Sequence, residues 1–155
     1  MQLKDEVDLL RRVPLFAGVA PSRLKLLAFT SDRVSYRPGD ILFKQGDPGD
    51  AAYVVLSGTA DILVSAGGND DIKVASIETN SIVGEIAILC DVARTATVKA
   101  SAPLETLRIK KDHFIRLLAE FPEMAVEIMR VLADRLSRTT AELSEARSEL
   151  RRRSH

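Results

Sequence analysis

The stretch that decides the fold is Asp61-Ile62-Leu63-Val64-Ser65-Ala66-Gly67-Gly68-Asn69-Asp70-Asp71-Ile72-Lys73-Val74-Ala75. Two short runs rich in β-branched residues, 61–64 and 72–75, flank the turn residues 67–70, and this pattern predicts a β-hairpin. Runs of the same kind occur on both sides, at 34–36, 41–43, 53–56, 97–100 and 106–109. Glycine-containing turns separate them, so the residues predict an all-β sandwich, barrel or jelly roll.

Helical patterns flank this β-rich region. Before it, helical spacing from Leu3 runs up to Pro14, and Pro21 opens a second short helix with Leu24, Leu27 and Ala28 on one face. After it, a short helix is expected over residues 113–119, and Pro122 restarts the chain. Residues 123–153 contain neither glycine nor proline, which predicts one long helix.

An apolar residue recurs every seven positions along that long helix. The series comprises Met129, Leu136, Leu143 and Leu150, and Leu132, Thr139 and Ala146 occupy the interleaved positions. Such a heptad seam favours pairing with a second copy of the helix, and we expect a homodimer. The alternative is a single amphipathic helix that packs on its own domain.

Composition excludes several classes of protein. The chain has 155 residues, 22 basic and 22 acidic side chains and hence no formal net charge, which argues against nucleic-acid binding driven by bulk charge. One cysteine and two histidines cannot build a multi-cysteine or histidine-rich metal site. No membrane span or signal peptide is evident, so we expect a cytoplasmic protein with a reduced Cys90 as a small core residue.

The segment Ser81–Val98 carries the candidate chemistry. Gly84 lets the backbone approach a ligand closely, and the amides of Ile86 and Ala87 at a helix start suit an anion. Arg94, nine residues after Glu85, can return to the same spot and pair with a phosphate through its planar guanidinium. Glu85 fits such a site if the ligand also offers a sugar hydroxyl, because a carboxylate is a strong acceptor.

This segment resembles the phosphate-binding cassette of cyclic nucleotide-binding domains. The upstream turns at 38–40, 45–47 and 49–50, with Tyr53 and Ser57-Gly58, resemble the glycine-rich turns of the same family, and the resemblance covers about Leu10 to Arg147. It implies a mainly β, jelly-roll-like eight-stranded β-roll with N-terminal short helices and a long C-terminal helix. Residues 1–122 would form the β-roll with its N-terminal helices, and residues 123–155 a lid and dimerisation helix of the same domain.

The resemblance also implies roles for individual residues. Glu85 would accept a hydrogen bond from the ribose 2′-hydroxyl, and Arg94 would neutralise the cyclic phosphate. Thr95 would offer a hydroxyl, and the helix residues Thr139 and Thr140 would contact the base across a dimer. The full set expected to bind the ligand is Val83, Gly84, Glu85, Ile86, Ala87, Arg94, Thr95, Ala96, Thr139 and Thr140.

The function that follows is a cyclic nucleotide sensor, binding cAMP, cGMP or both, that signals through its C-terminal helix to an unknown downstream protein. One alternative is a regulatory fragment of a larger channel, kinase or transcription factor. A cupin-like enzyme is the alternative of another class, but we expect no catalysis, no metal and no cofactor besides the ligand. Direct DNA binding by this chain alone is not expected, since residues 1–155 show no helix-turn-helix pattern. The residues leave the preference between cAMP and cGMP open.

Overall fold

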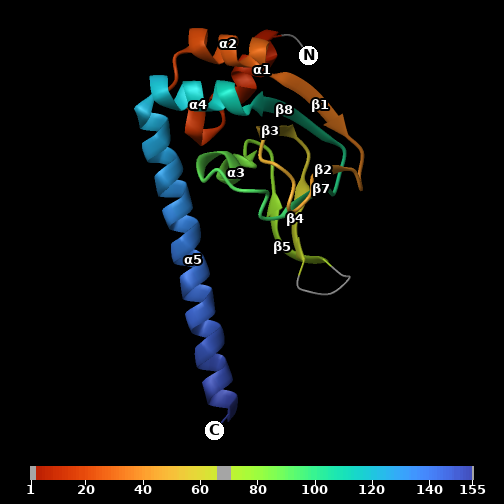
Figure 1. Cartoon of the computed structure of the whole chain (residues 1–155), viewed down its shortest axis with the longest axis vertical. Helices are drawn as coiled ribbons and strands as arrows, with labels where there is room; N and C mark the ends of the chain where they lie inside the picture. The colour runs from red at the N-terminus through yellow and green to blue at the C-terminus, as the bar shows by residue number, and fades with distance from the viewer. Residues whose placement is uncertain (1–2, 66–70, 155) are drawn as a thin grey trace.

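The computed structural model describes residues 3–65 and 71–154 and contains two four-stranded antiparallel sheets (Figure 1). The strands of the first sheet, in spatial order, are β1 (Asp32–Tyr36), β8 (Leu104–Lys110), β3 (Ala51–Ser57) and β6 (Ile82–Val83). Those of the second are β2 (Ile41–Phe43), β7 (Thr97–Ala100), β4 (Ala60–Ser65) and β5 (Asp71–Ile77). The predicted eight-stranded β-roll is confirmed. The residue pattern had revealed seven of the strands, and β6 is only two residues long.

Helices cover one end and one side of the roll (Figure 1). They are α1 (Leu3–Arg11), the 3₁₀ turn η1 (Pro14–Phe16), α2 (Pro21–Thr30), α3 (Glu85–Leu89), α4 (Lys111–Glu120) and α5 (Pro122–Ser154). Prolines begin η1, α2 and α5, because the first turn of a helix does not need the missing N–H. The expected short N-terminal helices and long C-terminal helix are both confirmed.

Strand β3 carries the core, because six of its seven residues are buried. The alternation of side chains along the strand divides them between two clusters. Ala52 and Val54 pack among residues of α1, α2, α4 and α5, whereas Tyr53 and Val55 pack between the two sheets. One apolar run thus joins the helical layer to the interior of the roll.

The two strands of the predicted hairpin are paired as expected. Strands β4 and β5 are antiparallel, with Asp61 opposite Ser76 and Val64 opposite Ile72. The turn residues 67–70 lie outside the described residues. Strand β5 forms an edge of its sheet, and its Ile72 and Val74 are 53% and 58% exposed.

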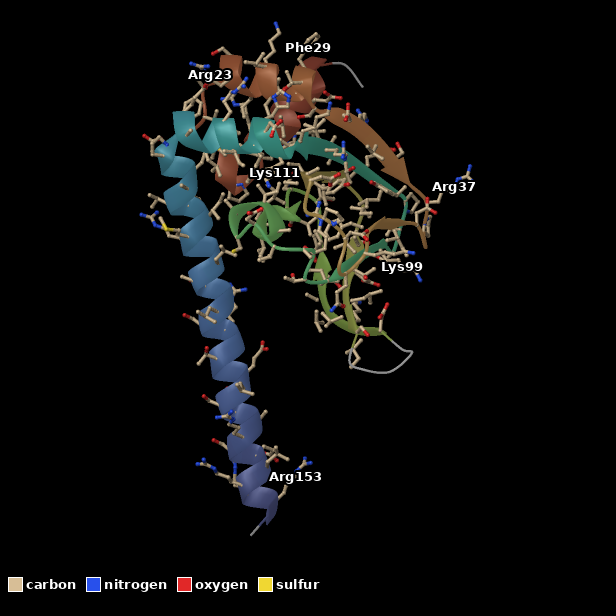
Figure 2. All side chains as sticks on the ribbon, viewed as in Figure 1. Arg23, Phe29, Arg37, Lys99, Lys111 and Arg153 are labelled. Atoms are coloured by element: carbon tan, nitrogen blue, oxygen red, sulfur yellow. The ribbon has the colours of Figure 1, made fainter. Side chains whose placement is uncertain are left out.

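Helix α5 changes its surroundings along its length. Met124 and Ile128 are buried in the core of the helical layer, whereas Leu136 and Leu143 are mostly exposed. Figure 2 shows the last turns of this helix, up to Arg153, extending beyond the β-roll. None of the helices in the described part of the chain combines the length and apolar character that crossing a bilayer needs.

Candidate functional site

Helix α3 begins at a glycine in a left-handed conformation. Gly84 is the N-cap residue with φ 87°, a region that favours glycine over residues with a Cβ. This turn places Glu85 and Ala87 against the protein, where they are 4% and 5% exposed. The amides in the first turn of a helix have no acceptor within the helix, so the N-terminus of α3 presents donors beside a buried carboxylate.

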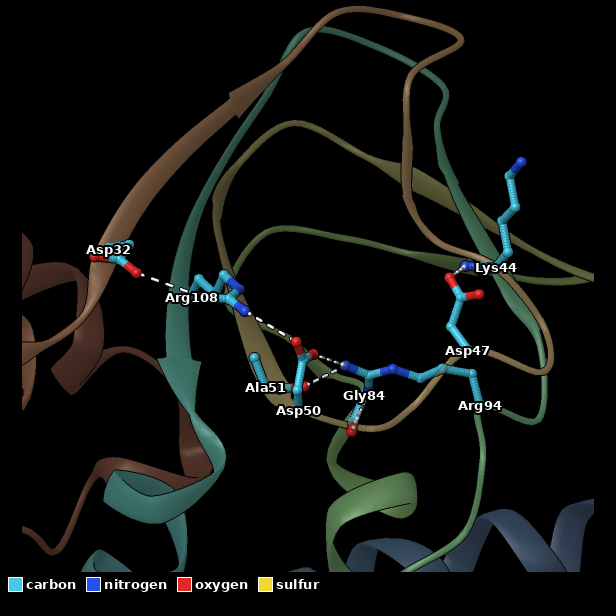
Figure 3. Close-up of polar contacts among 8 residues, drawn as sticks. All are labelled: Asp32, Lys44, Asp47, Asp50, Ala51, Gly84, Arg94 and Arg108. Atoms are coloured by element: carbon cyan, nitrogen blue, oxygen red, sulfur yellow. Dashed lines mark hydrogen bonds and ion pairs between the residues drawn. The ribbon is translucent and has the colours of Figure 1, made fainter.

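Arg94 returns to that helix start, as expected (Figure 3). Its Nη1 donates to the carbonyl oxygen of Gly84 at 2.7 Å, and its Nη2 donates to that of Ala51 at 2.6 Å. The guanidinium carbon lies 4.1 Å from the centre of the Phe43 ring, in cation–π geometry. The side chain is 1% exposed, so a positive charge is held at the point where β3, β6 and α3 meet.

The environment of Arg94 is unusual for a cation. Burial lowers the pKa of its guanidinium from the ordinary value, although an arginine stays charged in proteins. Nε is buried and has no hydrogen-bond partner among the described residues. A buried donor without an acceptor is costly, so this atom favours the approach of an acceptor such as a phosphate oxygen.

The loop between β2 and β3 holds the backbone of Arg94. The N–H of Gly46 donates to the carbonyl oxygen of Arg94, and the N–H of Arg94 donates to that of Asp47, both at 2.8 Å. The Asp47 carboxylate in turn accepts from the backbone N–H of Lys44 at 3.0 Å, which closes the turn around Gly46. The upstream glycine-containing turn therefore belongs to the same site as the cassette.

The same loop packs tightly on α3. A Cβ added to Gly49 would collide with the Cβ of Ala87, so only glycine permits this approach. Glycine at position 49 thus positions the helix, whereas Gly46, at φ 93°, is required for its turn.

A groove opens beside the cassette, between the roll and α5. Its volume is about 630 Å³, within the range of small-molecule sites. It is lined by Ile62, Val74, Ala75, Ser76, Ile77, Ser81, Ile82, Val83, Arg138 and Glu142. Six of the lining residues are apolar and lie on β4, β5 and β6, two are serines, and the two charged residues come from one face of α5. Such a groove suits a flat ring with polar edges.

The ten expected ligand residues fall into three groups. Val83, Gly84, Glu85, Ile86 and Ala87 form the end of β6 and the start of α3, and Arg94 reaches them. Ala96 is partly buried and Thr95 is exposed in the loop that leads to β7. Thr140 is exposed on α5 and does not line the groove, and the side chain of Thr139 lies outside the described residues.

The sequence pattern did not identify several residues of the site. Phe43, Asp50 and Ala51 contact the Arg94 guanidinium, and Arg138 and Glu142 line the groove. Asp50 was visible as part of a turn motif, but its pairing with Arg94 joins segments more than forty residues apart. One expectation was wrong: Cys90 is exposed rather than buried, because it follows the last residue of the short helix α3.

Comparison with known proteins agrees with this fold. The model of the cyclic nucleotide-binding domain family matches residues 33–121, more than half of the chain. The chain therefore belongs to the cyclic nucleotide-binding domain family.

Individual relatives extend the comparison. A CRP-like cAMP-activated global transcriptional regulator of Mycobacterium tuberculosis is 28% identical over 138 residues, which are 89% of this chain and 62% of that protein. The structure of the Thermus thermophilus catabolite activator protein is 30% identical with a TM-score of 0.75, covering 84% of this chain and 62% of that one. The sensor domain of the transcriptional regulator DNR from Pseudomonas aeruginosa, at 24% identity, has the same fold, with a TM-score of 0.78 and coverage of 86% and 90%. The chain thus spans about three fifths of the length of the first two.

Proposed function

We propose that this chain is a sensor that binds cAMP or cGMP without chemically changing it. The observation that carries the proposal is the buried Arg94 guanidinium at the start of α3, beside a groove that α5 lines on one side. The cyclic phosphate of the nucleotide would bind at Arg94, and its purine would lie in the groove. The family and the Mycobacterium tuberculosis regulator, which is named as cAMP-activated, support a cyclic nucleotide as the ligand.

At the phosphate end, the proposal assigns the charge to Arg94 and the hydroxyl acceptor to Glu85. The amides of Ile86, Ala87 and Ala96 would complete the contacts to the phosphate. Arg94 currently donates to two backbone carbonyls, so binding would redirect some of its donors to phosphate oxygens. That exchange gives the ligand a way to shift the cassette between two arrangements.

Isothermal titration calorimetry with both nucleotides tests the proposal directly. We expect saturable binding of at least one of them with one site per chain, and no binding of the linear 5′-monophosphate at the same concentrations. Heat that never saturates with either cyclic nucleotide would contradict the function.

At the base end, Glu142 is expected to discriminate between the two purines. A carboxylate accepts hydrogen bonds only, and guanine presents a ring N–H beside its amino group whereas adenine presents the amino group alone. Glu142→Gln should therefore weaken cGMP binding by roughly tenfold and cAMP binding less, since a two-bond contact to a base is worth about 1–3 kcal/mol.

Glu145→Gln provides the matched control, because Glu145 is exposed on the same helix and does not line the groove. Calorimetric titration of each variant with each nucleotide measures the ratio of the two affinities. An unchanged ratio in Glu142→Gln would remove the carboxylate from base recognition.

We propose further that α5 pairs with α5 of a second copy and transmits the binding event. Met129, Leu136, Leu143 and Leu150 are 59%, 69%, 53% and 63% exposed at heptad spacing, and large apolar side chains repeated along one face favour a covered surface. A nucleotide in the groove would contact the same helix at Arg138 and Glu142, so nucleotide binding and helix pairing would both involve α5.

Introducing charge into this seam should abolish pairing. Leu136→Glu combined with Leu143→Glu is expected to give a monomer of about 17.0 kDa in sedimentation equilibrium, whereas the parent is expected to sediment as a dimer. Ser148→Glu adds a charge to an exposed position of α5 away from the seam and should leave the mass unchanged. A parent protein that sediments as a monomer would refute this assignment.

A further inference from the structure

A second arginine lies behind the candidate phosphate site. Arg108 occupies the middle of β8, paired in register with Asp32 at the start of β1 and with Tyr53 in β3. Its Nη1 is 3.5 Å from Oδ2 of Asp32, and its Nη2 donates to Oδ2 of Asp50 at 3.2 Å (Figure 3). Arg108 therefore connects Asp32, the first residue of β1, with Asp50, the residue before β3.

Asp50 is shared between the two arginines. Its Oδ1 lies 3.5 Å from Nη2 of Arg94, while its Oδ2 faces Arg108. Its carbonyl oxygen accepts from the backbone N–H of Lys111 at 2.9 Å, and the next residue, Ala51, supplies the carbonyl that Arg94 uses. A movement of Asp50 would therefore change both the ion pair between its carboxylate and Arg94 and the hydrogen bond from Arg94 to the carbonyl oxygen of Ala51.

The charges of Asp50, Arg94 and Arg108 determine whether the loss of Arg108 would strengthen or weaken anion binding. Asp50 offsets part of the positive charge that Arg94 presents to an anion, and Arg108 draws on the same carboxylate. Without Arg108 the cluster would be more negative by one charge, and Asp50 would pair with Arg94 alone. Both changes disfavour an anion at the site.

We propose that Arg108 is a positioning residue for the anion site: it holds the Asp50 carboxylate between two guanidinium groups and so preserves the positive charge of Arg94. It acts through Asp50 and contacts no ligand. The consequence for affinity rests on the proposed function, whereas the coupling from Arg108 through Asp50 to Arg94 is a property of the ligand-free protein.

The coupling can be measured without nucleotide, through the ¹H–¹⁵N signal of the buried Arg94 Nε, assigned by its loss in Arg94→Lys. Arg108→Gln should shift this signal, and the shift should largely vanish when Asp50→Asn is already present, which is the signature of action through a shared partner. Arg33→Gln is the matched control, because Arg33 is similarly exposed on the neighbouring strand but pairs with Glu6 and Glu105. The coupling would be overturned if Arg33→Gln shifted the signal as much as Arg108→Gln does. It would also be overturned if Arg108→Gln shifted the signal equally with and without the Asp50→Asn change.

Calorimetric titration with cAMP and cGMP tests the consequence for affinity. Arg108→Gln should raise Kd roughly two- to fivefold, a range set by the strength of partly exposed ion pairs, and Arg108→Lys should restore most of the loss. Parent-like affinity in Arg108→Gln would overturn this consequence. If the parent binds neither nucleotide, the proposed function fails and the affinity claim fails with it, whereas the Nε signal still decides the coupling.

Discussion

Replacing Arg94 with alanine is expected to abolish most of the thermal stabilisation that a cyclic nucleotide gives this protein. A ligand at ~100 times its Kd adds about 2.7 kcal/mol to the free energy of unfolding, or roughly 5–10 °C in Tm for a domain of this size. Arg94 is the buried cation at the start of α3, so its removal takes away the charge that the phosphate would meet. Thermal melting with and without each nucleotide measures the effect.

The ligand-free protein must be melted alongside, because Arg94 also has a structural role. Truncation leaves the carbonyl oxygens of Gly84 and Ala51 without this donor, at a cost of about 1–3 kcal/mol for each buried group left unsatisfied. Arg94→Lys keeps the charge and should retain part of the nucleotide effect, and Arg37→Ala removes an exposed arginine and should retain all of it. A variant without Arg94 that gains as much from nucleotide as the parent would contradict the proposed site.

Gly84→Ala is expected to have the second large effect. Gly84 has φ 87°, and an added Cβ would lie 2.6 Å from Nη1 of Arg94 and 3.3 Å from the carbonyl oxygen of Ala51. The left-handed backbone alone costs about 1–2 kcal/mol for alanine, and overpacking adds about 1–3 kcal/mol. The variant should therefore lose stability in urea denaturation and bind nucleotide more weakly, because the collision displaces Arg94.

Gly39→Ala separates the two contributions. Gly39 has a similar φ of 95°, but nothing lies within 4 Å of an added Cβ. This variant should show the backbone cost alone and bind nucleotide like the parent. Equal losses of stability in the two variants, with equal affinities, would mean that the contact between Gly84 and Arg94 has no bearing on the site.

The ends of several elements could be predicted because their signals are local. Strands β2 and β7 have the expected bounds, and prolines begin α2 and α5 as predicted. Strand β6 could not be found in this way, because two residues show no periodicity and its pairing with Tyr53 and Val54 of β3 is distant in sequence. The exposure of Cys90 also depends on how α3 packs rather than on its apolar neighbours.

The sequence by itself determined the β-rich region, the flanking helices and the order of the cassette motif from Gly84 to Ala96, because turn glycines, side-chain alternation and motif order are properties of contiguous residues. The family resemblance of that motif narrowed the β-rich region to a β-roll. Only the tertiary structure decided what surrounds Arg94: the carbonyl of Ala51, the ring of Phe43 and the carboxylate that Arg94 shares with Arg108. It also decided that Arg138 and Glu142 line the groove. These partners come from β2, β3, β8, α5 and the loop before β3. Sheet pairing and helix packing, which have no local signature, bring them together.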